Sequence, residues 1–144
     1  MQTRMEITTP RRVLFLCTGN SCRSQIAEAL VNADPGHNWR AFSAGSSPTG
    51  YVHPLALKVL EEVGIHHKGT SKSLDTFKDQ SFDLIITVCN DVEENCPVWL
   101  GGGRQLHLAF ADPVKVAGTD DEKLKAFRRL RDEMRLKILP VLPV

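Results

Sequence analysis

A short apolar run that ends in a cysteine and a glycine-containing turn is the feature that most constrains this chain. Residues 12–17 (RVLFLC) are mostly apolar and too few for a helix, so they predict a buried strand. The turn leads into residues 24–33 (SQIAEALVNA), where apolar side chains recur at helical spacing. A strand, a tight turn and a helix in this order are typical of an α/β domain.

The same alternation of strands and helices continues along the chain. Further strands are predicted at residues 39–43, 83–88 and 105–110, and helices at residues 53–63 and from Thr119 to the residue before Pro140. Thr119 and Glu122 have the spacing of a capping box, which marks a helix start. The pattern predicts an α/β fold: a single-domain three-layer α/β/α structure with a four-stranded parallel sheet. We expect a flexible arm over residues 1–11 and the domain over residues 12–144.

Composition narrows the class of function. The formal net charge is +1, from 18 basic and 17 acidic side chains, which gives no reason to expect nucleic acid or a membrane as partner. No apolar stretch approaches the roughly 20 residues of a membrane span, and the polar N-terminus does not resemble a secretory signal. We therefore expect a cytoplasmic protein, and a monomer because no apolar surface stripe is left unassigned.

In a reducing cytosol its four cysteines favour catalysis, metal binding or burial over structural disulfides.

The turn over residues 17–24 (CTGNSCRS) has the features of an oxyanion-binding loop. Its backbone N–H groups can converge on one centre, and the helix that follows adds its positive N-terminal end. That field should stabilise the thiolate of Cys17 as a nucleophile, with the Ser24 hydroxyl as a hydrogen-bond donor to it. The expected anion-binding residues are Thr18, Gly19, Asn20, Ser21, Cys22 and Arg23, of which Arg23 can chelate two oxygens. The alternative is a buried cysteine beside an ordinary helix cap, and we expect Cys22 to be a passive neighbour.

At these residues the chain resembles the low-molecular-weight protein tyrosine phosphatase superfamily and, within it, the thioredoxin-coupled arsenate reductases. The similar stretches are CTGNSCRSQIAEAL, residues 43–45 (SAG), residues 88–97 (VCNDVEENCP) and residues 110–123 (FADPVKVAGTDDEK). The resemblance implies a low-molecular-weight phosphatase-like fold, arsenate as substrate and thioredoxin as electron donor. It also implies that Asp112 is the general acid for the leaving oxygen. An ordinary Asp-Pro turn is the alternative for Asp112.

Cys89 and Cys96 follow a predicted strand and suit a two-electron reduction. Attack of Cys89 on a Cys17–arsenate adduct would expel arsenite and leave a Cys17–Cys89 disulfide. Attack of Cys96 on Cys89 would then free Cys17 by thiol–disulfide exchange. Plain burial of the two thiols is one alternative. A zinc site is disfavoured because the cysteine spacing lacks the usual Cys-x2-Cys, so no metal is expected.

Two other functions compete with arsenate reduction. A tyrosine phosphatase usually has proline after the loop serine, where this chain has Gln25, and tyrosines after Asp-Pro, where it has Val114 and Lys115. We therefore expect at most a weak phosphatase activity, since phosphate and arsenate share shape and charge. A non-catalytic oxyanion or redox sensor is the third possibility, but it would have no use for the acid and the relay.

The resemblance also bears on a cation behind the loop. Some members bind potassium with residues that match Asn20, Glu28 and Ser43, together with an acid directly after a Thr-Ser pair. Here Thr70 and Ser71 are followed by Lys72. Our hypothesis is that the Lys72 ammonium group replaces the potassium ion by pairing with Glu28.

Overall fold

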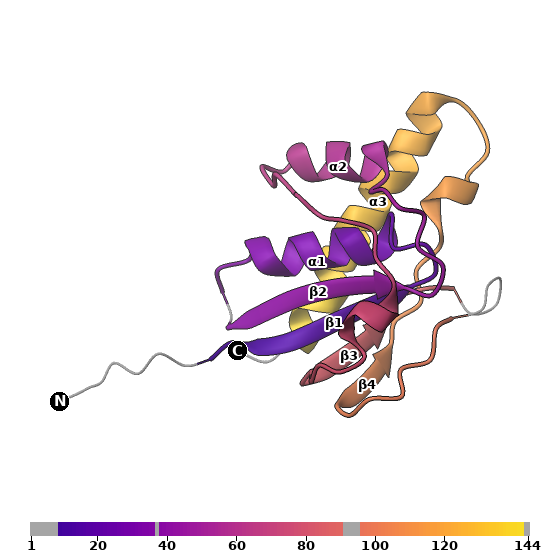
Figure 1. The fold of residues 1–144 in the computed structure, drawn as a ribbon. Helices are drawn as coiled ribbons and strands as arrows, with labels where there is room; N and C mark the ends of the chain where they lie inside the picture. The colour runs from indigo at the N-terminus through magenta and orange to yellow at the C-terminus, as the bar shows by residue number, and fades with distance from the viewer. Residues whose placement is uncertain (1–8, 37, 91–95, 143–144) are drawn as a thin grey trace.

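A four-stranded parallel sheet forms the centre of the computed structural model, which describes residues 9–36, 38–90 and 96–142 (Figure 1). The strands lie in the order β2-β1-β3-β4, and every neighbouring pair is parallel. Their bounds are Arg11–Cys17 for β1, Trp39–Gly45 for β2, Leu84–Thr87 for β3 and Arg104–His107 for β4. The predicted four-stranded parallel sheet is thus confirmed.

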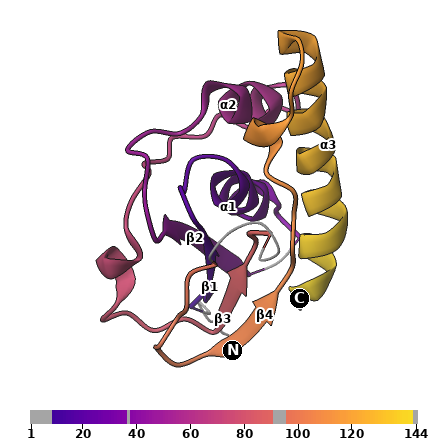
Figure 2. The same ribbon diagram turned by 90° about the vertical axis from the view of Figure 1, so that its right-hand side faces the viewer.

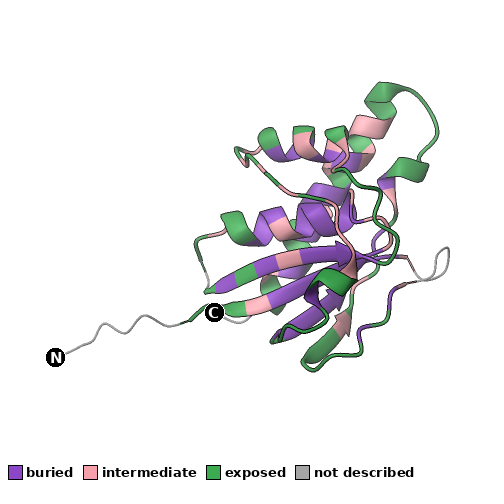
Figure 3. Ribbon diagram, viewed as in Figure 1, coloured by how far each residue is buried: buried purple, intermediate pink, exposed green. Residues whose placement is uncertain are grey.

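The central strand β1 carries the most buried part of the sequence. Its residues 13–16 are 0% exposed, because a central parallel strand is covered on both faces. Val13 and Phe15 pack on one face of the sheet, and Leu14 and Leu16 pack on the other. Each such apolar side chain contributes about 1.5–3 kcal/mol by leaving water. Figure 3 shows the buried part of β1, and this buried strand fixes the position of its last residue, Cys17.

Three α-helices lie on the side of the sheet that Val13 and Phe15 face. They are α1 (Arg23–Ala33), α2 (Pro54–Glu61) and α3 (Asp120–Ile138), which is followed by the 3₁₀-helix η3 (Leu139–Val141). Of these, α1 packs directly on β1 and β2, and α2 packs on α1 and α3 (Figure 2). The capping box between Thr119 and Glu122 is present at the start of α3, as predicted. None of the described helices combines the length and the apolar character needed to cross a membrane.

The opposite face of the sheet is covered differently from the expected helical layer. The short 3₁₀-helix η1 (Leu74–Phe77) and the extended segment around Trp99 cover Leu14 and Leu16 there. Phe82 joins them, with ring centroids 5.7 Å from Phe77 and 5.8 Å from Trp99. The connection between α2 and β3 is polar and has too few apolar residues at helical spacing to form a longer helix.

The strand order reverses beside β1, which locates the ligand site. The chain leaves β1 to form β2 on one side and later adds β3 on the other side. In open parallel sheets, ligands bind beyond the carboxyl ends of the two strands at such a reversal. Cys17 is the last residue of β1, and Cys89 lies two residues beyond the end of β3. Both cysteines therefore lie at the edge of the sheet where a ligand is expected.

Candidate active site

The loop between β1 and α1 turns its carbonyl groups outward. The oxygens of Cys17, Thr18, Gly19 and Ser21 accept hydrogen bonds of 2.9–3.3 Å from backbone N–H groups between residues 46 and 53. In a planar trans peptide the N–H points opposite to the carbonyl, so the N–H groups of this loop turn inward. The N–H of Asn20 reaches the Cys17 sulfur at 3.2 Å. The loop therefore has the inward donors that an oxyanion requires.

Asn20, rather than Gly19, has the left-handed backbone that the loop requires. Its φ of 50° is the only positive φ of a non-glycine residue in the described part of the chain. Asparagine is among the residues that adopt this conformation most readily. Gly45 at the end of β2 lets the loop approach, because a side chain there would overlap the Thr18 carbonyl.

Cys17 is 2% exposed, and its sulfur lies 2.9 Å from the Ser24 hydroxyl. The side-chain amide of Asn20 donates to the same hydroxyl oxygen at 2.7 Å. Because Ser24 already accepts from Asn20, its own hydrogen is available for the sulfur. Two donors, the Asn20 N–H and the Ser24 O–H, are thus directed at Cys17.

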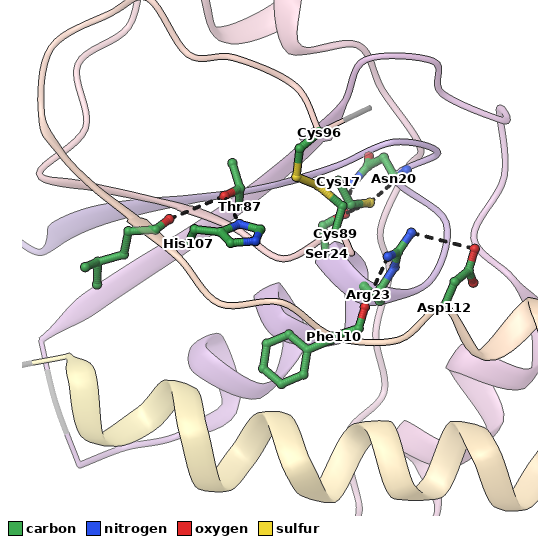
Figure 4. The surroundings of a disulfide bond; sticks show 11 residues. Cys17, Asn20, Arg23, Ser24, Thr87, Cys89, Cys96, His107, Phe110 and Asp112 are labelled. Carbon is green, nitrogen blue, oxygen red and sulfur yellow. Dashed lines mark hydrogen bonds and ion pairs between the residues drawn. A yellow bond between two sulfur atoms is a disulfide. The ribbon is translucent and has the colours of Figure 1, made fainter. Parts of the chain in front are cut away.

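A cavity of about 370 Å³ opens beside Cys17. All of the loop residues from Thr18 to Arg23 line it, as do Ser47, Thr49, Tyr51, His53, Asp112, Val114 and Lys115. Arg23 is buried, donates to the Phe110 carbonyl at 3.2 Å, and lies 3.6 Å from the Asp112 carboxylate (Figure 4). The other Asp112 oxygen accepts from the Val114 N–H at 3.0 Å and caps the 3₁₀-helix η2 (Pro113–Lys115). A cation, an acid and a thiol therefore share one cavity.

Cys22 lies in the same loop but is a different kind of thiol. Burial raises its pKa to about 12, against the smaller lowering effect of the Ser21 hydroxyl. Cys22 is therefore protonated near neutral pH.

Cys89 and Cys96 are joined by a disulfide with a Cα–Cα distance of 5.9 Å. Cys89 is 0% exposed and Cys96 is partly exposed, and the bond lies beside Cys17 in Figure 4. The side chains of Thr87 and His107 meet nearby at 2.7 Å. Most of the segment between the two cysteines, residues 91–95, lies outside the described residues. The two relay cysteines thus lie within disulfide distance of each other, next to the loop.

The expected supporting residues lie behind the loop. Ser43 donates to Glu28 at 2.7 Å, and the backbone N–H of Lys72 donates to the Asn20 side-chain oxygen at 2.9 Å. The Lys72 ammonium group donates to the Thr70 carbonyl at 2.8 Å. Burial lowers the pKa of Lys72, and the nearby charge of Glu28 opposes that shift. Among the described residues no group of three or more His, Cys, Asp or Glu side chains is placed to hold a metal ion.

Two further residues, Gln25 and His67, support the loop although neither was predicted to do so. Gln25 is 0% exposed, and its amide nitrogen donates to Asn20 and to the Thr70 carbonyl. Its oxygen lies 2.8 Å from a ring nitrogen of His67, which is half-buried. A glutamine among the apolar residues at the start of α1 was the available signal for Gln25. Nothing local in the sequence indicated His67.

Several known proteins are similar to this chain in both sequence and fold. The family described as low molecular weight phosphotyrosine protein phosphatase matches residues 12–136. An arsenate reductase of Halalkalibacterium halodurans is 42% identical over 127 residues, which are 88% of this chain and 91% of that protein. The crystal structure of an arsenate reductase from Archaeoglobus fulgidus has a TM-score of 0.68 at 30% identity, covering 86% of this chain and 96% of that one.

A third match differs in length. A thioredoxin-dependent arsenate reductase of Corynebacterium glutamicum has a TM-score of 0.57 at 31% identity, covering 90% of this chain and 65% of that one. The family match spans most of the domain, including the loop, the relay cysteines and Asp112. By sequence and by fold, the chain belongs to the low-molecular-weight phosphotyrosine protein phosphatase family.

Proposed function

We propose that this protein reduces arsenate to arsenite through a thiol adduct on Cys17 and a disulfide relay through Cys89 and Cys96. The observation that carries the proposal is the Cys89–Cys96 disulfide beside an oxyanion loop that begins with a hydrogen-bonded thiol. A phosphatase needs the loop but has no use for the pair. Relatives that are named arsenate reductases and cover most of this chain support the same assignment.

The first step is attack of the Cys17 thiolate on arsenic in the cavity. The inward N–H groups of the loop and the Arg23 guanidinium stabilise the negative oxygens. A sulfur–arsenic bond forms, and an arsenic–oxygen bond breaks. Asp112 supplies the proton with which that oxygen leaves as water. Arsenic remains in oxidation state V.

Reduction follows by attack of a second thiolate on the adduct and then by one thiol–disulfide exchange. The Cys89 thiolate attacks the Cys17 sulfur, and the sulfur–arsenic electron pair passes to arsenic, which leaves as arsenite. The Cys96 thiolate then attacks Cys89, forms the disulfide seen here, and releases the Cys17 thiolate. Two electrons and two protons from a dithiol donor restore the pair. Thioredoxin is the proposed donor, as in the thioredoxin-dependent relative, and the cytoplasm is the proposed compartment because it keeps these thiols reduced.

Loop support is part of the proposal. Asn20 directs the Ser24 hydroxyl, while Glu28, Ser43 and Lys72 hold the loop from behind. The positive charge of Lys72 takes the place of a potassium ion.

A turnover assay with arsenate, thioredoxin, thioredoxin reductase and NADPH tests the function. NADPH oxidation should require arsenate and should stop in Cys89→Ser. Hydrolysis of phosphate esters that survives Cys89→Ser, without arsenate-dependent NADPH oxidation, would instead identify a phosphatase. Oxyanion binding without either activity would identify a sensor.

A further inference from the structure

The amide of Gln25 is fully buried and every polar atom of it has a partner. Its nitrogen lies 3.2 Å from the Asn20 carbonyl, 3.1 Å from the Asn20 side-chain oxygen and 2.9 Å from the Thr70 carbonyl. Its oxygen lies 2.8 Å from Nε2 of His67. A buried amide with such partners is held in one orientation, because turning it over would place its oxygen against three acceptors.

The sense of each hydrogen bond in this network follows from two groups that cannot change roles. The Lys72 backbone N–H can only donate, so the Asn20 atom that it contacts is the oxygen, and the Asn20 nitrogen faces Ser24. The Thr70 carbonyl can only accept, so the Gln25 nitrogen faces it and the Gln25 oxygen faces His67. Nε2 of His67 must therefore carry the hydrogen and donate it.

We propose that His67 is a positioning residue for the reaction. Its donated hydrogen bond fixes Gln25, which fixes Asn20, which orients the Ser24 hydroxyl toward the Cys17 sulfur. Without His67 the buried Gln25 oxygen loses its hydrogen-bond partner, so the native orientation of the amide is less strongly favoured. The inference rests on the proposed role of Cys17 as nucleophile.

The surroundings of His67 suit this role. A side chain at Gly69 would overlap both the Gln25 oxygen and Nε2 of His67, so glycine there leaves room for the contact. Burial lowers the pKa of His67, and Lys72 lowers it further while Glu28 opposes both. Nε2 carries a hydrogen both in the neutral tautomer required here and in the charged ring. The hydrogen bond from His67 to Gln25 therefore persists in both states.

Alkylation of Cys17 in the reduced protein tests the proposal. The rate of modification by iodoacetamide is followed at Cys17 by peptide mass mapping. His67→Phe keeps a ring but no donor, and it should slow alkylation roughly two- to tenfold, as expected for one lost hydrogen bond. His67→Gln keeps a donor near the Nε2 position and should restore the rate. His66→Phe is the matched control, because the neighbouring His66 is exposed. Its ion-pair partner among the described residues is Glu61.

Three results would overturn the proposal: an unchanged rate in His67→Phe, equal slowing in His67→Gln, or equal slowing in His66→Phe. Gly69→Ala provides a second test if His67→Phe does not fold. It changes neither Gln25 nor His67, but the added methyl group would overlap the two atoms that form their contact. It should slow alkylation to a similar degree, and a wild-type rate would contradict the proposal. Alkylation of Cys17 does not require arsenate. If the proposed function is wrong, arsenate turnover will be absent, but the alkylation rates of the variants will still rank as described.

Discussion

The Arg23 guanidinium lies 3.6 Å from the Asp112 carboxylate inside the anion cavity. The proposed reaction uses these two groups in opposite ways, Arg23 to hold the anion and Asp112 to donate a proton. Without an anion they neutralise each other. An entering oxyanion competes with Asp112 for Arg23, and Asp112 then faces the negative charge of the anion.

Asp112→Asn should therefore separate anion binding from catalysis. The amide oxygen of asparagine can still cap η2 by accepting from Val114, but the charge that competes for Arg23 is lost. Phosphate should bind more tightly, measured by titration calorimetry, while arsenate turnover should fall by roughly two orders of magnitude or more. Asp75→Asn, outside the cavity, is the control. Turnover retained in Asp112→Asn would remove Asp112 from the mechanism.

The relay predicts a trapped intermediate in Cys96→Ser. Cys89 can still attack Cys17 and release one arsenite, but nothing then resolves the bond. One equivalent of arsenite should form with a Cys17–Cys89 disulfide, detected by peptide mapping without reductant. Cys89→Ser should form no disulfide at Cys17. A Cys96→Ser protein that turns over many times would rule out the proposed order of attack.

Cys22 should resist alkylation in the folded protein. Burial raises its pKa to about 12, so between pH 7 and 9 almost no thiolate is present to react. In the reduced protein, iodoacetamide should modify Cys17 well before Cys22, and the two should react alike after denaturation. Peptide mapping at several times measures both rates. Early modification of Cys22 would show that the loop opens readily.

Local sequence was enough to predict the loop and its candidate nucleophile, but not the residues that support them. Cys17, Arg23 and Ser24 lie within eight residues of one another, and the strand before them and the helix after them made this spacing a candidate site. The contact between Gln25 and His67 joins positions 42 residues apart, and the sense of its hydrogen bond depends on Thr70 and Lys72. Such a contact exists only in the folded chain.

The same reason explains two differences in the fold. The predicted turn contains Gly19, but its left-handed residue is Asn20, whose side-chain oxygen accepts a hydrogen bond from the backbone N–H of the distant Lys72. The second face of the sheet was expected to be helical, yet Phe82 and Trp99 cover it from extended chain. Periodicity reveals an amphipathic helix, whereas single aromatic residues in a polar stretch do not reveal what they cover.

Glu62 should stabilise the packing of α2 against α3 in a pH-dependent way. Hydrogen bonds from Arg128 and Arg131 lower its pKa from 4.5 to about 2. A carboxyl group whose pKa is lower in the folded state than in the unfolded state stabilises the folded state at pH values above its unfolded-state pKa. The stabilisation is lost as the pH falls through the folded-state pKa. Glu62→Gln should lower the Tm above about pH 5, and the difference from wild type should vanish toward pH 2. Glu61→Gln, at a more exposed neighbour, should change the Tm little at any pH.

Replacement of a potassium ion by Lys72 predicts a rate that does not depend on the alkali cation. The Lys72 ammonium group lies 2.8 Å from the Thr70 carbonyl and near the Glu28 charge, so the positive charge behind the loop is already present. Arsenate turnover should be equal in KCl and NaCl at matched ionic strength. Lys72→Asp removes that charge and adds a carboxylate, so its turnover should become several-fold faster in KCl than in NaCl. Lys68→Asp, on an exposed neighbour, should remain indifferent. A several-fold potassium activation of the wild-type protein would show that the Lys72 ammonium group does not replace the ion.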